Sequence, residues 1–265
     1  MSPVNGALSV KSLLSLTVIH LVLSGAATGQ RLVTPEREPD PPNSPATRPE
    51  PRRRLNVDPE KLMAQLASRK EDDRQSALRE LGVTGPPGLT IREVTVSAAN
   101  LDTDGDLERV LVVKTLSVSH ASILKRESDT WWQVGSFACC LSRSVEPFVE
   151  LRETVWPGTK DILIHRMSAQ GTGVGSGDLQ IYRMWRGRLY KVFDIVESSY
   201  DFAHTVTTQI HYPDEESNSS PRRIVVHRSV EANSRKRSEC LPYQWDASKF
   251  AFLQIPASKS LCQGN

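Results

Sequence analysis

The run Arg109-Val-Leu-Val-Val113 has the composition of a buried β-strand, and two later runs share its layout. These are Asp161-Ile-Leu-Ile-His165 and Arg223-Ile-Val-Val-His227. A polar loop precedes each run, and before each loop lies an earlier strand-like segment: residues 91–98, 148–155 and 206–212. Short apolar runs bounded by turn residues are typical of strands inside a sheet. From residue 89 to 265 the sequence therefore predicts a mainly β fold.

A predicted β-hairpin follows each of the three runs. Its turns carry charged residues, Ser or Gly: 127–129, 186–188 and 246–248. An aromatic ring stands after each turn, at Trp131, Tyr190 and Phe250, with spacings of 59 and 60 residues. We expect an antiparallel meander of about three four-stranded repeat units, as an open sheet or a sandwich, because a closed propeller has about four to eight blades. Chance recurrence of β-rich segments is the alternative.

Residues 55–84 predict a short α-helical hairpin ahead of the sheet. Asp58-Pro59-Glu60 supplies an N-cap with proline in the first turn. Apolar side chains then recur at helical spacing: Leu62, Met63, Leu66, Ala67, Ala77, Leu78 and Leu81. The segment resembles one HEAT-like helical hairpin over about 25 residues, and a solenoid needs several such repeats. The resemblance therefore implies a single helix pair that packs against the next domain.

The N-terminal residues predict export. An apolar run from Leu13 to Leu23 follows Lys11 and precedes Ala27-Thr28-Gly29, which is the layout of a secretory signal peptide over residues 1–29. The run is shorter than the roughly 20 residues that cross a bilayer, so a membrane anchor is the weaker interpretation. No later segment has the length and apolar character of a span. We expect a periplasmic or extracellular protein without a membrane span in its mature chain.

Residues 30–54 predict a disordered or extended linker. Seven of these 25 residues are proline and few are apolar. Such a segment cannot bury enough apolar surface to offset the entropy lost on ordering. The predicted domains are thus residues 1–29 as signal peptide, 30–54 as linker, 55–84 as helical hairpin and 89–265 as β-repeat domain.

The charge balance argues against nucleic acid as a partner. The chain has 33 basic and 31 acidic side chains, for a net charge of +2, whereas nucleic-acid binders are normally more basic. Two local basic runs, residues 52–54 and 235–237, lie among polar residues and are interpreted as solvated loops.

Four cysteines in an exported chain permit up to two disulfides. Cys240 with Cys262 would close the C-terminal end, and Cys139 or Cys140 with Cys240 would join distant units. The sequence leaves these pairings open. The spacing excludes a conventional zinc site, which has paired ligands a few residues apart.

One polar loop has the oxygen-rich pattern of a cation site. The segment Asn100-Leu-Asp-Thr-Asp-Gly-Asp-Leu-Glu108 spaces five candidate ligands around Gly105, which permits a left-handed bend: Asn100, Asp102, Asp104, Asp106 and Glu108. Calcium takes about six to eight oxygen ligands, and Asp106 would contribute its carbonyl. An EF-hand is excluded because its twelfth position should be Glu and is Leu111 here. An ordinary polar hairpin turn is the alternative.

This loop resembles the calcium-binding turn of VCBS and FG-GAP repeat proteins, whose core D-x-[DN]-x-D-G-x-x-D leads into a strand of the Leu-Val-Val kind. The match covers about 14 residues, with Asn100 and Glu108 in place of Asp at its ends. The resemblance implies β-blades, calcium as a structural ion, and extracellular adhesion or recognition. The aligned loops of the other two units lack the full pattern. Their corresponding residues are Arg152, Thr154, Trp156 and Lys160 in the second unit, and Asp214, Glu216, Asn218 and Arg222 in the third.

Signals for catalysis are weaker. The glycine-rich run 171–177 lies between two predicted strands and lacks the helix and lysine of a phosphate-binding loop. We therefore predict an exported noncatalytic module that binds a protein or glycan of the cell envelope. The recurring rings Trp131, Tyr190 and Phe250 are interpreted as a stacked core. The alternative is that Trp131, Trp132 and Trp156 form a platform for a carbohydrate or peptide. A secreted hydrolase is the alternative, and a Ser or Cys beside a His would favour it.

Overall fold

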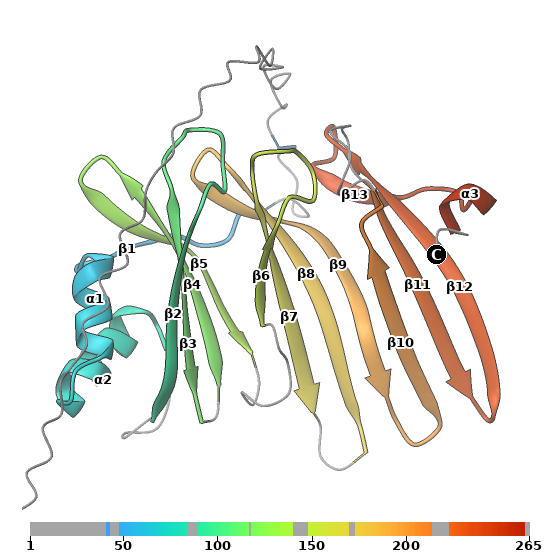
Figure 1. Cartoon of the computed structure of the whole chain (residues 1–265), viewed down its shortest axis with the longest axis horizontal. Coiled ribbons are helices and arrows are strands. Elements are labelled where there is room, and N and C mark those ends of the chain that lie inside the picture. The colour runs from blue at the N-terminus through green and yellow to red at the C-terminus, as the bar shows by residue number, and fades with distance from the viewer. Residues whose placement is uncertain are drawn as a thin grey trace, which may run out of the picture. The chain divides into compact units, whose positions relative to one another are not determined.

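The computed structural model describes residues 41–42, 48–83, 90–116, 118–139, 148–169, 173–213 and 223–262. All of them belong to one compact unit, residues 39–265. The predicted signal peptide and residues 30–40 and 43–47 of the predicted linker lie outside the described residues. The fold is mainly β with antiparallel sheets and a short helical part, as predicted (Figure 1).

The strands form two antiparallel sheets. The five-stranded sheet has the order β1-β5-β4-β3-β2, with β1 (Arg53–Arg54), β2 (Ile91–Ala99), β3 (Glu108–Thr115), β4 (Ser119–Glu127) and β5 (Thr130–Cys139). The eight-stranded sheet runs in chain order and comprises β6 (Val149–Arg152), β7 (Asp161–Ala169), β8 (Gly175–Trp185), β9 (Arg188–Tyr200), β10 (His204–His211), β11 (Arg223–Ala232), β12 (Arg235–Asp246) and β13 (Ala251–Gln254). Because β9 and β10 pair over residues 198–200 and 205–207, the second and third predicted units share one sheet.

The predicted helical hairpin consists of α1 (Pro59–Leu66) and α2 (Glu71–Glu80). Asp58 caps α1, since its carboxylate accepts the backbone N–H of Lys61 at 2.7 Å. The apolar stripes of both helices pack on one face of the five-stranded sheet, against Leu111, Val113 and Leu124. The single helix pair therefore covers one side of this sheet, as the sequence indicated.

The opposite face of the five-stranded sheet packs against the eight-stranded sheet. Val110, Val112 and Ile123 share a core with Ile162 and Ile164 of β7. At Gly135 the approach is close, because a Cβ there would come 2.7 Å from Leu189 of β9. The next residues along β7 and β8, Leu163 and Ile181, face away and pack with Ile224 and Val226 of β11. The two cores thus lie on opposite faces of β7 and β8.

The β4–β5 and β8–β9 hairpins match each other residue by residue, but the alignment between them differs from the predicted one. Each turn spans two residues, between Glu127 and Thr130 and between Trp185 and Arg188. Trp132 therefore holds the position of Tyr190, and the predicted match of Trp131 with Tyr190 is wrong by one residue. A one-residue shift reverses the face of a strand, and Trp131 indeed packs toward the helices while Trp132 packs between the sheets.

The last residues of the predicted linker belong to the sheet. Arg53 and Arg54 pair with β5 opposite Gln133 and Trp132, and the N–H of Glu50 donates to the carbonyl of Leu189 at 2.7 Å. Composition did not show this, because the segment forms backbone hydrogen bonds to a strand edge rather than burying an apolar stripe. Of the two forms predicted for the linker, disordered or extended, these residues adopt the extended one.

A disulfide joins Cys240 on β12 to Cys262 in the short helix α3 (Lys259–Cys262). It is the C-terminal pairing among those that the sequence left open. Cys139 is buried at the end of β5, and Cys140 lies outside the described residues.

Candidate metal centre

The acidic loop connects β2 to β3 and turns as its sequence predicts. Gly105 has a φ of 88°, the left-handed conformation that favours glycine. The carboxylates of Asp102 and Asp104 accept the backbone N–H groups of Asp104 and Asp106 at 3.1 and 3.0 Å. These short-range bonds fix the loop and leave the remaining carboxylate oxygens of Asp102 and Asp104 for other partners.

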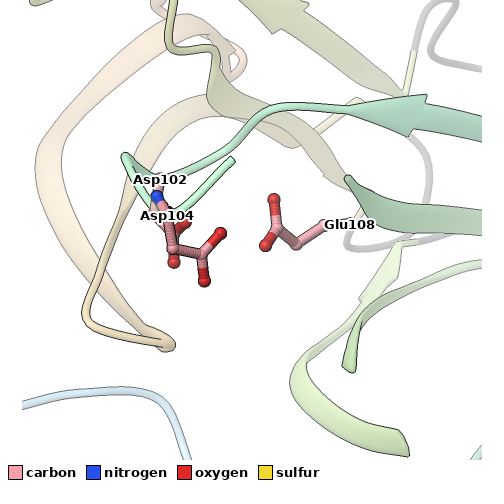
Figure 2. Close-up of side chains that lie close together, drawn as sticks. All are labelled: Asp102, Asp104 and Glu108. Atoms are coloured by element: carbon pink, nitrogen blue, oxygen red, sulfur yellow. Dashed lines mark hydrogen bonds between the residues drawn. The ribbon is translucent and has the colours of Figure 1, made fainter. Parts of the chain in front are cut away.

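Three of the five predicted ligands come together. Ligand oxygens of Asp102, Asp104 and Glu108 all lie within 4.8 Å of one another, so this group could hold a metal ion (Figure 2). Asp102 and Glu108 are buried, whereas the side chain of Asp104 is 45% exposed and opens the group to solvent. Carboxylate oxygens suit hard cations such as calcium and magnesium better than zinc or copper.

The other two predicted ligands, Asn100 and Asp106, have further contacts in and near the loop. The side-chain N–H of Asn100 donates to the carbonyl of Gly158 at 3.1 Å, and the backbone carbonyl of Asn100 accepts the N–H of Lys160 at 2.8 Å. Asn100 therefore ties the loop to the β6–β7 connection. Asp106 contributes its N–H to the turn, and its side chain is exposed.

A lysine lies at the centre of the carboxylate group. Lys125 extends from β4, is 4% exposed, and its ammonium donates to Asp102, Asp104 and Glu108 at 2.9, 2.6 and 2.6 Å. An ammonium with three carboxylate partners has all its donors satisfied. The sequence did not single out Lys125, because it begins the charged run Lys125-Arg126-Glu127 and gives no local sign of burial.

The pKa values reflect three carboxylates around one ammonium. Burial raises the pKa of Asp102 and of Glu108 despite the hydrogen bonds from Lys125. Burial alone would also raise the pKa of Asp104, but its hydrogen bonds to Asp102 and Lys125 outweigh that effect and lower it. Burial alone would lower the pKa of Lys125, but the three acceptors together raise it. Three carboxylates thus share one ammonium, and their negative charge favours the protonated form of Lys125.

A simpler version of the same arrangement occurs in the next four strands. Asp161 begins β7 and is bound at 2.8 Å by the guanidinium of Arg183 on β8, with both side chains buried. Asp161 also accepts the N–H of Thr154, seven residues earlier, just as Glu108 accepts that of Leu101, seven residues earlier. Asp161 therefore corresponds to Glu108. The sequence had predicted Lys160, the preceding residue, as the counterpart of Glu108.

The remaining predicted positions are less informative. Residues 214–222, including Arg222, lie outside the described residues. The three tryptophans considered as a platform pack against three different clusters: Trp131 beside the helices, Trp132 between the sheets, and Trp156 against the core within the eight-stranded sheet.

Two serines lie beside a histidine, which is the feature that would favour a hydrolase. Nε2 of His120 lies 3.1 Å from Oγ of the exposed Ser136, and Nδ1 lies 3.5 Å from Oγ of the buried Ser122. Burial and the positive charge of Arg53 lower the pKa of His120 to about 4. A base with so low a pKa is poorly matched to proton abstraction near neutral pH.

Comparison with protein families, curated proteins and solved structures found no match for the chain. Within the described residues, no helix combines the length and apolar character required to cross a membrane.

Proposed function

We propose that this protein is an exported, noncatalytic binding or envelope-associated module, and that its acidic loop is a structural cation site. Two cations compete for that site: the ammonium of Lys125 and a calcium ion. The observation that carries the cation site is the position of Lys125, whose ammonium is within hydrogen-bond distance of all three carboxylates. The site therefore fixes the β2–β3 loop onto β4.

Calcium is the metal that the chemistry of the ligands favours. All three side-chain ligands are carboxylates, and a nearby turn carbonyl and water would complete a coordination number of about six to eight. The entry side is Asp104, which is partly exposed. Calcium and the ammonium repel each other, so calcium binding requires Lys125 to leave, and the affinity of the wild-type protein for calcium should be low.

Thermal melting in calcium and in chelator tests the site. In millimolar calcium the melting temperature should rise slightly by mass action, and Asp104→Asn should abolish the rise. Glu127→Gln, on the neighbouring turn and outside the carboxylate group, is the matched control and should keep it. If the wild type and Asp104→Asn respond equally, calcium does not bind through the acidic loop.

Export is tested separately. Residues 1–29 fused to a reporter enzyme that folds only outside the cytoplasm should give activity, and replacing Leu14 and Leu21 with Arg should abolish it, because charges interrupt the apolar run of a signal peptide. Reporter activity equal to that of a leaderless fusion would contradict export.

The pair of Ser136 and His120 supports a second candidate, a secreted serine hydrolase. A fluorophosphonate probe should label Ser136 if the hydroxyl is activated, and Ser136→Ala should remove the label. We expect no labelling, because the low pKa of His120 makes it a weak base.

A further inference from the structure

Two hairpin turns lie at the same end of the eight-stranded sheet. They join β9 to β10 and β11 to β12, and these four strands are consecutive antiparallel neighbours. In Figure 1 both turns lie at the lower end of the sheet, whereas the acidic loop between β2 and β3 lies at the upper end of the neighbouring sheet. We call these two turns the hairpin end.

The turn between β9 and β10 presents an aromatic ring to solvent. Phe202 is 89% exposed and Tyr200 beside it is 39% exposed. Asp201 fixes the turn, since one carboxylate oxygen accepts the N–H groups of Ala203 and His204, each at 2.7 Å. The ring of Phe202 rests over Gly173 of the glycine-rich loop, where a Cβ would come within 2.9 Å of it. An ordered turn thus holds an apolar ring in water.

The adjacent turn is basic. Arg235 and Arg237 lie on one face of β12, opposite Ala232 and Val230, and with Asn233 they line a hollow of about 780 Å³. In the part of the chain that the structure describes, no carboxylate forms an ion pair with either arginine. The nearest acidic side chain in the hollow, Glu239, is already bound by Arg228 at 3.2 Å.

The other charged side chains of the two turns only partly offset these arginines. Lys236 lies directly across from Glu231, and Asp201 lies 3.3 Å from His204, which is charged only when protonated. With His204 neutral, the three basic side chains outnumber the two acidic ones, so the hairpin end carries a net positive charge.

Taken together, these contacts lead us to propose that the hairpin end docks on an anionic lipid bilayer. Phe202 inserts among the acyl chains near the headgroups, and Arg235 and Arg237 bind headgroup phosphates in the hollow. A guanidinium fork matches phosphate oxygens in geometry and charge. An apolar residue flanked by basic residues is the usual composition of a surface that associates with anionic membranes. This inference rests on the proposed envelope-associated role and names its partner, but it does not involve the acidic loop.

Vesicle sedimentation tests the proposal on the purified protein. Vesicles of phosphatidylcholine alone are compared with vesicles containing one quarter phosphatidylglycerol, at low and high salt. We expect binding to the anionic vesicles that weakens with salt. Phe202→Ser should lower the partition coefficient about tenfold, because burying a phenylalanine ring is worth at least that factor. Arg235→Gln combined with Arg237→Gln should lower it roughly 30-fold, since each basic residue near the surface contributes about fivefold.

Matched controls lie at the other end of the strands. Leu107→Ser removes an apolar side chain that is 54% exposed in the acidic loop, and Arg126→Gln with Arg188→Gln removes two charges at the opposite turns. These variants should bind as the wild type does. Circular dichroism melting verifies that each variant is folded.

Three outcomes would overturn the proposal. They are equal binding to neutral and anionic vesicles, unchanged binding of Phe202→Ser and the arginine double variant, and binding of a sulfated polysaccharide with no binding to vesicles. The last result would assign the arginines to an anionic glycan instead. These vesicle-binding results do not test the role of Lys125. The cation site is tested separately, by thermal melting in calcium and in chelator.

Discussion

Glu108 and Lys125 face each other at the adjoining ends of β3 and β4, and the ammonium of Lys125 lies 2.6 Å from Oε1 of Glu108. Asp161 and Arg183 repeat this relationship on β7 and β8 at 2.8 Å. In both pairs the acid also accepts a backbone N–H from the loop that precedes its strand. A buried ion pair therefore fastens each loop to its hairpin, and the first loop differs by adding two more carboxylates.

Removal of Lys125 should destabilise the protein strongly. Lys125→Met leaves buried carboxylates without a counter-ion, and breaking a buried ion pair costs about 3–5 kcal/mol. Urea unfolding followed by circular dichroism measures this loss. Lys191→Met, at a lysine that pairs with Asp194 on the surface, is the control and should cost less than about 1 kcal/mol. Similar losses for the two variants would contradict the role assigned to Lys125.

The pair of Asp161 and Arg183 should behave as one unit. Asp161→Leu or Arg183→Met alone leaves a buried charge unpaired and should cost about 3–5 kcal/mol, whereas the double variant should cost less than the sum of the single losses. A double-mutant cycle of unfolding free energies measures this coupling. Additive losses would mean that the two side chains act independently.

His120 should make the protein sensitive to acid. Its pKa is lowered to about 4 in the folded state by burial and by Arg53, whereas the unfolded chain takes up the proton near 6.5. Stability is therefore lost as the pH falls from 6.5 toward 4, by up to about 3 kcal/mol. His120→Gln should flatten this dependence, and His204→Gln, at an exposed histidine, should not. Parallel pH profiles for wild type and His120→Gln would refute the assignment.

Reduction of the disulfide should release the C-terminal helix. Cys240 and Cys262 are 22 residues apart, and closing a loop of this size stabilises a protein by about 3 kcal/mol in the chain-entropy description. The variant with both cysteines replaced by Ser should lose about that much, as measured by urea unfolding. No change between oxidised and reduced wild type would contradict a stabilising link.

The fold class, the helical hairpin and the turn at Gly105 follow from local patterns, and the structure agrees with them. Strand register does not follow from local patterns. The match of Trp132 with Tyr190 depends on which residues form the two-residue turns and on hydrogen bonds between strands. The edge strand at Arg53 could not be predicted from composition either, because backbone hydrogen bonds to β5 do not depend on the side chains.

The candidate site was predicted in part. The spacing of Asp102, Asp104 and Glu108 indicated that their oxygens converge, and they do. Asn100 also contacts Gly158, 58 residues away, and Lys125 enters from a strand that the loop motif does not include. Long-range contacts of this kind are set by the packing of the sheets, which a local motif does not encode.

Calcium affinity in the presence and absence of Lys125 tests the central claim most directly. Isothermal titration calorimetry compares the wild type with Lys125→Met and with Lys125→Arg, which keeps the positive charge. If ammonium and calcium compete for the same carboxylates, Lys125→Met should bind one calcium ion at least tenfold more tightly than the wild type, and Lys125→Arg should bind as weakly as the wild type, since every 1.4 kcal/mol of relieved repulsion is a factor of about ten. Equal calcium affinity in the wild type and Lys125→Met, or no binding by either protein, would contradict the account.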